Sequence, residues 1–206
     1  MSDRRLELFA TVLLAVATVA TAWAAYQSRE WTGEQSQGYS RANATRADVN
    51  RTAALVNRQV QIDVATFTQW VDAHAQHRAA LAAFYAARFR NEFKPAFGAW
   101  RATKPFTNRA APKTPFAMPQ YRLRAAARTD RLESRATAAS QGAKDANQHA
   151  DNYMLAVVLS ASSLFFAGLS TKLETRTARI TLLALGWAIF LGTAIWIATF
   201  PTHVTI

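Results

Sequence analysis

The chain of 206 residues contains no cysteine, which excludes disulfide bonds, a cysteine nucleophile, thiolate zinc sites and cysteine-ligated iron–sulfur clusters. Helix-breaking residues are scarce, since no proline precedes Pro95 and no glycine lies between Gly38 and Gly98. The sequence also lacks the G-x-S-x-G, Walker, G-x-G-x-x-G and H-E-x-x-H signatures. We therefore expect long helices, and we expect neither catalytic nor cofactor-binding residues.

Three apolar runs stand out from a mean hydropathy of only −0.07. They cover residues 6–26, 153–169 and 180–200, and their one charged side chain is Glu7. A helix rises about 1.5 Å per residue, so a run of 21 residues spans about 31 Å, the thickness of a bilayer core. The shorter second run can extend through Lys172, whose long side chain reaches the interface. The sequence therefore predicts three transmembrane helices.

The first apolar run has an alternative interpretation as a secretory signal peptide. Two arginines precede it, and Ala22-Trp23-Ala24 resembles an A-x-A cleavage site. The run is longer than the apolar region of a usual signal peptide. We therefore expect an uncleaved membrane anchor.

The distribution of basic residues in the short segments predicts the orientation. Arg4 and Arg5 precede the first run, and the loop 171–179 carries Lys172, Arg176 and Arg179. The tail 201–206 has no lysine or arginine. Basic residues in short loops stay in the cytoplasm. We expect a multi-pass membrane protein with a cytoplasmic N-terminus, whereas residues 27–152 and the C-terminus lie on the outer side of the membrane.

The segment 27–152 is predicted to be helical because alanine, arginine and glutamine dominate it. One apolar stripe recurs at helical spacing from Val49 to Phe67, and a second runs from Leu81 to Trp100. A helix end is expected between His74 and Arg78. The loop 104–119 holds four of the six prolines and is expected to be extended, and a helix resumes near Gln120 and continues into the second span.

These elements predict an all-α integral membrane protein with three transmembrane helices. A long helical stalk or hairpin lies between spans one and two. The expected domains are the N-terminal tail with span one (1–26), the helical extramembrane domain (27–152), spans two and three (153–200) and the C-terminal tail (201–206).

The extramembrane segment is basic, with 19 lysines and arginines against 10 aspartates and glutamates. Such a surface attracts polyanions, including lipid headgroups and nucleic acid. Between Arg41 and Arg58 the arginines recur at intervals of five to seven, and between Arg122 and Arg135 at intervals of two to four, which is typical of the solvated face of a helix. We therefore favour a solvated face, and we do not expect nucleic acid as a partner.

One histidine pair raises the question of a metal site. His74 and His77 are three residues apart, a spacing that can place two imidazoles on one helix face. Asp72 lies next to them, but no third strong ligand is evident. We predict a solvated pair and no metal. Glu7 is expected to reach headgroups or to pair with Arg4.

Small residues inside the spans are the strongest functional indication. Glycine, alanine, serine and threonine let membrane helices approach closely and bond across the contact. The candidate helix-packing or pore residues are Thr11, Thr18 and Thr21 in span one, Ser160, Ser163 and Gly168 in span two, and Ala184, Ala188 and Gly192 in span three.

The layout resembles a family of bacterial inner-membrane proteins defined by a domain of unknown function. One span, a charged helical segment and two C-terminal spans make up that layout. The stretches Leu8-Phe-Ala-Thr-Val-Leu-Leu-Ala and Leu164-Phe-Phe-Ala-Gly-Leu-Ser-Thr-Lys-Leu are similar to the family. The resemblance implies a location in the bacterial inner membrane, with residues 27–152 and the C-terminus in the periplasm, and it implies no reaction and no site residues.

These observations predict a non-enzymatic membrane protein without cofactors. We expect it to contact membrane lipids and to associate with itself or with another membrane protein. Its role is that of a scaffold or accessory subunit acting through the extramembrane helices. The alternative is a homo-oligomeric channel that favours anions, with the threonine face of span one lining the pore.

Overall fold

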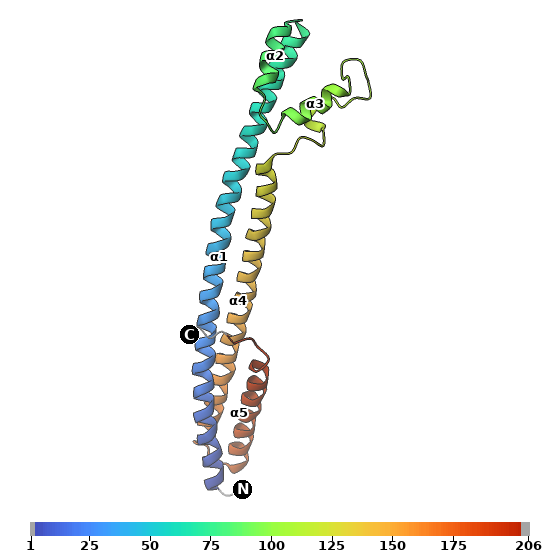
Figure 1. The fold of residues 1–206 in the computed structure, drawn as a ribbon. Helices are drawn as coiled ribbons and strands as arrows, with labels where there is room; N and C mark the ends of the chain where they lie inside the picture. The colour runs from blue at the N-terminus through green and yellow to red at the C-terminus, as the bar shows by residue number, and fades with distance from the viewer. Residues whose placement is uncertain (1–2, 203–206) are drawn as a thin grey trace. The chain divides into compact units, whose positions relative to one another are not determined.

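The computed structural model describes residues 3–202, and every regular element in that range is a helix (Figure 1). The prediction of an all-α fold is therefore confirmed. The helices are α1 (Asp3–Ala75), α2 (Ala79–Arg88), α3 (Lys94–Ala102), the short 3₁₀ helix η1 (Pro115–Ala117), α4 (Arg124–Ser170) and α5 (Arg176–Ile197).

Three of these helices, α1, α4 and α5, are long and apolar enough to cross a membrane. They contain the first two apolar runs and residues 180–197 of the third, so the prediction of three helices long and apolar enough to span a membrane is confirmed. Helix α5 has 22 residues and spans about 33 Å at about 1.5 Å per residue, slightly more than the hydrocarbon core. Helix α4 continues without a break from Arg124 into the second apolar run, as expected.

The chain divides into two compact units. The terminal unit comprises Met1–Arg41 and Ala138–Ile206, and the central unit comprises Ala42–Thr137. Helices α1 and α4 each contribute to both units.

In the terminal unit, α1 and α4 run antiparallel. The Ser28 hydroxyl donates a hydrogen bond of 3.0 Å to the Ala150 carbonyl, and Gln35 Nε2 donates one of 2.7 Å to Asn147 Oδ1. Still further along α1, Gly38 lies against Ala143. Residue numbers that rise along one helix and fall along the other define the antiparallel contact.

The α1–α4 contact is made largely of small residues. An added Cβ at Gly38 would lie 2.9 Å from the Ala143 Cβ, so the two backbones approach closely. The buried positions recur every seven residues, the period at which two helices keep the same faces in contact. They include Ala10, Ala17, Ala24 and Gly38 in α1, and Ala143, Ala146, Ala150, Tyr153, Ser160 and Ala167 in α4.

Helix α5 packs beside α1 and α4 along its whole length. Near its start, Arg179 lies 4.0 Å from Glu7, which was expected to meet headgroups or Arg4. Beyond its end, the Tyr153 hydroxyl donates a hydrogen bond of 3.2 Å to the Pro201 carbonyl. An apolar cluster fills the space between α1, α4 and α5 and comprises Leu6, Ala10, Leu13, Ala17, Ala167 and Leu183.

In the central unit, α1 ends at Ala75 without glycine or proline. His77 adopts a left-handed conformation with φ 58°, and its N–H bonds the His74 carbonyl at 3.1 Å. The Arg78 N–H bonds the Ala73 carbonyl at 2.9 Å. This pair of bonds is the Schellman motif, in which glycine is the usual residue at the position of His77. The predicted helix end between His74 and Arg78 is confirmed.

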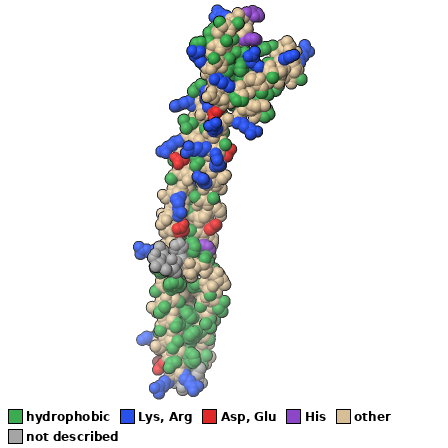
Figure 2. All heavy atoms as spheres, viewed as in Figure 1, with side chains coloured by type: hydrophobic (Ala, Val, Ile, Leu, Met, Phe, Trp, Pro, Cys, Tyr) green, Lys and Arg blue, Asp and Glu red, His purple; other side chains and the backbone are tan. Residues whose placement is uncertain are grey.

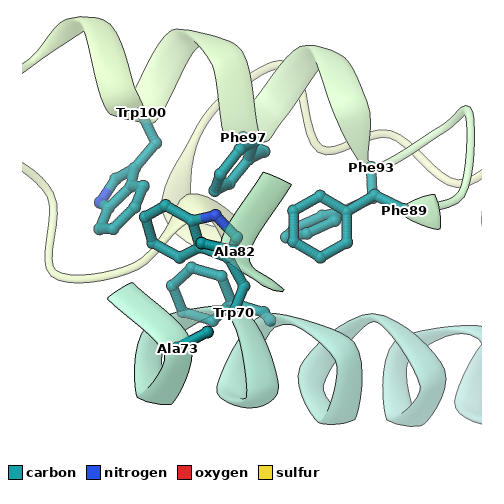
Figure 3. Close-up of a cluster of buried hydrophobic side chains, with 8 residues drawn as sticks. Trp70, Ala73, Ala82, Phe89, Phe93, Phe97 and Trp100 are labelled. Carbon is teal, nitrogen blue, oxygen red and sulfur yellow. The ribbon is translucent and has the colours of Figure 1, made fainter. Parts of the chain in front are cut away.

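The second apolar stripe forms two helices rather than one. Helix α2 ends at Arg88, and α3 begins at Lys94 with Pro95 in its first turn. The break brings Phe89, Phe93, Phe97 and Trp100 onto one cluster with Trp70 of α1 (Figure 3). Rings meet edge to face there, as between Trp70 and Phe97 at 4.8 Å.

The proline-rich loop packs onto this aromatic cluster. Trp100 Nε1 donates a hydrogen bond of 2.7 Å to the Pro112 carbonyl, and Phe116 stacks on Phe93 at 5.2 Å. The loop is not extended as expected: besides the single turn of η1 it contains hydrogen-bonded turns, as where the Thr107 and Asn108 N–H groups bond the Lys104 carbonyl at 3.0 and 2.9 Å. Helix α4 begins at Arg124, four residues later than predicted.

Candidate functional site

The threonines proposed to line a pore all lie in the apolar part of α1. Thr11 and Thr18 are exposed, whereas Thr21 is half-buried. Each hydroxyl donates to the carbonyl four residues earlier, at 2.9 Å for Thr11 and at 2.7 Å for Thr18 and Thr21. These hydroxyl protons are therefore committed to the backbone of α1.

The small residues of α4 face inward. Ser160 and Ser163 are buried, and the Ser163 hydroxyl donates to the Leu159 carbonyl at 3.1 Å. Ser160 Oγ has no hydrogen-bond partner among residues 3–202. Gly168 is half-buried, and an added Cβ there meets nothing within 4 Å. The two serines thus lie in the interior of the terminal unit rather than on its surface.

The small residues of α5 lie on its outer side. Ala184, Ala188 and Gly192 are all exposed, and an added Cβ at Gly192 meets nothing within 4 Å. The inner side of α5 uses other residues, among them Leu183 and Gly186. We call Ala184, Ala188 and Gly192 the outer α5 face.

The sequence did not indicate a polar network in the central unit that centres on Asp63. Asp63 is fully buried, and its Oδ2 accepts hydrogen bonds from Arg90 Nη1 at 2.7 Å and from the Tyr121 hydroxyl at 3.0 Å. Arg90 Nη2 also bonds Glu92 Oε2 at 2.6 Å. Asp63 Oδ1 has no hydrogen-bond partner among residues 3–202.

Burial is the main cause of the pKa shifts of Asp63 and Tyr121 in this network. Loss of water raises the pKa of Asp63 above its ordinary value of 3.8, although the hydrogen bonds from Tyr121 and Arg90 oppose the shift. The pKa of Tyr121 is raised by burial and by the neighbouring Asp63 carboxylate. Tyr121 therefore remains a protonated donor.

The histidine pair lies near the C-terminal end of α1 without a third ligand. Within residues 3–202, no group of three or more His, Asp or Glu side chains is arranged to hold a metal ion. The His74 ring stacks instead on Trp70 at 5.0 Å and on Phe106 at 4.8 Å.

The contacts of Asp63 could not be recognised in the sequence, because they join residues that lie far apart along the chain. Asp63 and Arg90 are 27 residues apart, and Asp63 and Tyr121 are 58 apart. The one available indication was Asp63 itself, a carboxylate between Val60 and Phe67 in the apolar stripe of the helix.

The fold and these residues define a helical protein with three candidate membrane spans, an exposed small-residue face and a buried polar network. No protein-family model, curated protein or solved structure matches the chain.

Proposed function

We propose that this chain is a non-enzymatic, multi-pass protein of the bacterial inner membrane that self-associates within the bilayer. It acts as a scaffold or accessory subunit and presents its extramembrane helices to other proteins of the envelope. The observation that carries the proposal is the outer α5 face.

The outer α5 face has the spacing of a membrane helix contact. Ala184, Ala188 and Gly192 follow one another at intervals of four and are exposed. In a bilayer, close packing of such small residues drives helix association, because lipid chains give no hydrophobic incentive. The inner side of α5 already serves the contacts within the chain, so the outer face is available to a second copy.

The proposed orientation rests on the basic residues of the terminal unit. The contact between Glu7 and Arg179 brings the start of α1 and the start of α5 to the same end of this unit. In Figure 2, Lys and Arg side chains lie at that end, next to a hydrophobic band. The arrangement supports a cytoplasmic N-terminus under the positive-inside rule.

The mass of the detergent-solubilised particle tests self-association. Light scattering corrected for bound detergent should give a discrete homo-oligomer for the wild type. Ala188→Leu and Gly192→Leu should each shift the particle toward a single protomer, because a leucine side chain separates the helices. Ala161→Leu places the same side chain on the exposed side of α4 and should leave the mass unchanged. A wild-type mass of one protomer overturns the proposal.

A channel is the second candidate, favoured by the exposure of Thr11 and Thr18. In an oligomer this face of α1 would line a polar path, and the basic extramembrane segment would favour anions. Anion flux into liposomes should then fall in Thr18→Leu, whereas Val19→Leu should be neutral. Liposomes with oligomeric protein that pass no ions exclude this candidate and leave the scaffold role.

A further inference from the structure

A pocket of about 210 Å³ opens in the central unit, next to the aromatic cluster that contains Trp70. Trp70 and His74 of α1 form one side of it, and Arg101 lies in the last turn of α3. The segment after α3 completes the wall with Lys104 and Phe106. All these residues belong to one compact unit, so the pocket is a feature of that unit alone.

Three rings form a stack at this pocket. The His74 ring lies 5.0 Å from Trp70 with 10° between their planes, and 4.8 Å from Phe106 with 28° between their planes. Phe106 nevertheless keeps 61% of its surface exposed. An aromatic surface at the pocket is therefore open to a ligand.

The polar part of the pocket is cationic. Arg101 and Lys104 line it, and no aspartate or glutamate does. Neither side chain has a carboxylate partner among residues 3–202. Two cations without counter-ions beside an aromatic wall attract an anion that they can hold with charge-assisted hydrogen bonds.

The backbone at Lys104 is strained in a way that favours this role. Lys104 has φ 53°, a left-handed conformation that glycine or asparagine usually supplies after a helix. The next residue is Pro105, which has no N–H and cannot add the second bond of a Schellman motif. A lysine held in this conformation at a pocket rim fits the tendency of backbone strain to gather at binding sites.

We propose that this pocket binds a water-soluble phosphate monoester that carries a small ring. Arg101 and Lys104 bind the phosphate oxygens, and the ring of the ligand lies on the exposed surface of Phe106. A phosphate dianion matches the two cations, whereas a carboxylate would neutralise only one of them. The volume is below that of a typical pocket for a drug-sized molecule, which limits the ligand to a compact group. This inference is independent of the proposed self-association.

Calorimetric titration of the full chain in a non-ionic detergent tests the proposal, with phenyl phosphate as the probe. Phenyl phosphate should bind, and phenol should give no measurable heat. Inorganic phosphate should bind about threefold to tenfold more weakly than phenyl phosphate, because it lacks the ring contact. The proposal is wrong if phenyl phosphate does not bind, or if phenol or inorganic phosphate binds as tightly.

Variants then assign the contacts. Arg101→Gln and Lys104→Asn should each weaken binding of phenyl phosphate by about tenfold or more, because each removes a charge-assisted bond. Asparagine tolerates the left-handed backbone, and Lys104→Gly gives the same test without any strain. Phe106→Ala should lower the affinity for phenyl phosphate to that for inorganic phosphate.

Arg109→Gln is the matched control, since Arg109 is an exposed cation of the same loop outside the pocket. It should change the affinity by less than about twofold, the size of a screened long-range charge effect. Circular dichroism should give the same helix content for every variant. If folded Arg101→Gln and Lys104→Gly bind phenyl phosphate like the wild type, the assignment is overturned.

Discussion

The Tyr121 hydroxyl donates a hydrogen bond of 3.0 Å to Asp63 Oδ2 in the central unit. This bond joins α1 to the segment just before α4. The same carboxylate oxygen also receives Arg90 Nη1 from the turn between α2 and α3. The buried carboxylate of Asp63 therefore connects α1, the turn between α2 and α3, and the segment just before α4.

The first prediction concerns removal of either end of this bond. Asp63→Ala should destabilise the protein by about 3 kcal/mol, since Arg90 then loses a buried partner, although it keeps Glu92. Tyr121→Phe should cost about 1.5 kcal/mol, the value of a hydrogen bond to a charged group. Thermal unfolding of Asp63→Ala, of Tyr121→Phe and of the variant with both substitutions measures these losses of stability. A double variant whose loss equals the sum of the single losses would contradict a direct interaction.

The second prediction concerns pH. Because the folded state raises the pKa of Asp63, it binds the proton more tightly than the unfolded chain does. The stabilisation is fully present below the ordinary value of 3.8 and is lost as pH rises through the pKa of the folded state. The unfolding temperature of the wild type relative to Asp63→Asn should therefore fall with rising pH above this value. Asp72→Asn, at an exposed position of the same helix, is the control. A relative unfolding temperature that rises over this window would show that the shift has the opposite sign.

The third prediction compares two glycines of α1. Gly33→Ala should stabilise the protein by about 0.5–1 kcal/mol, because alanine favours the helix and a Cβ there meets nothing within 4 Å. Gly38→Ala should destabilise it despite the same gain, because its Cβ would lie 2.9 Å from the Ala143 Cβ and 3.2 Å from the Ala143 Cα. Thermal unfolding of the two variants measures the difference. Equal stabilisation by both substitutions would mean that the helices are further apart.

The fourth prediction concerns the attachment of the proline-rich loop. Trp100→Phe removes the bond from Nε1 to the Pro112 carbonyl and should cost about 1 kcal/mol. The loop should then open more often, so trypsin should cleave faster after Arg109 and after Lys113. Limited proteolysis at a temperature where the helices stay folded measures the rate. Phe84→Leu alters an exposed aromatic residue of the same unit and should leave the rate unchanged.

The local features of the fold could be predicted from the sequence. Three apolar runs indicated the helices that are long enough to cross a membrane, and four prolines located the loop. The split between Arg88 and Lys94 could not be seen, because the apolar spacing continues across it. The break places Phe89 and Phe93 in the buried aromatic cluster.

The long-range contacts could not be predicted in the same way. Nothing near Asp63 in the sequence indicates that Arg90 and Tyr121 meet it. The pocket formed by Trp70, Arg101 and Lys104 likewise depends on how the chain returns after α3. Spacing arguments describe one element at a time, whereas these sites need the fold that brings elements together.

The seven-residue recurrence of small residues between α1 and α4 has a consequence for the alignment of the two helices. The small residues set how closely the helices approach, but the recurrence is incomplete, because a displacement of seven residues can bring Trp31 to the place of Gly38 against Ala143, where even a Cβ would lie at 2.9 Å. The alignment is therefore set by Gly38 against Ala143 and by the side-chain hydrogen bond between Gln35 and Asn147. Insertions or deletions should be tolerated in this region only when seven residues change in both helices at once.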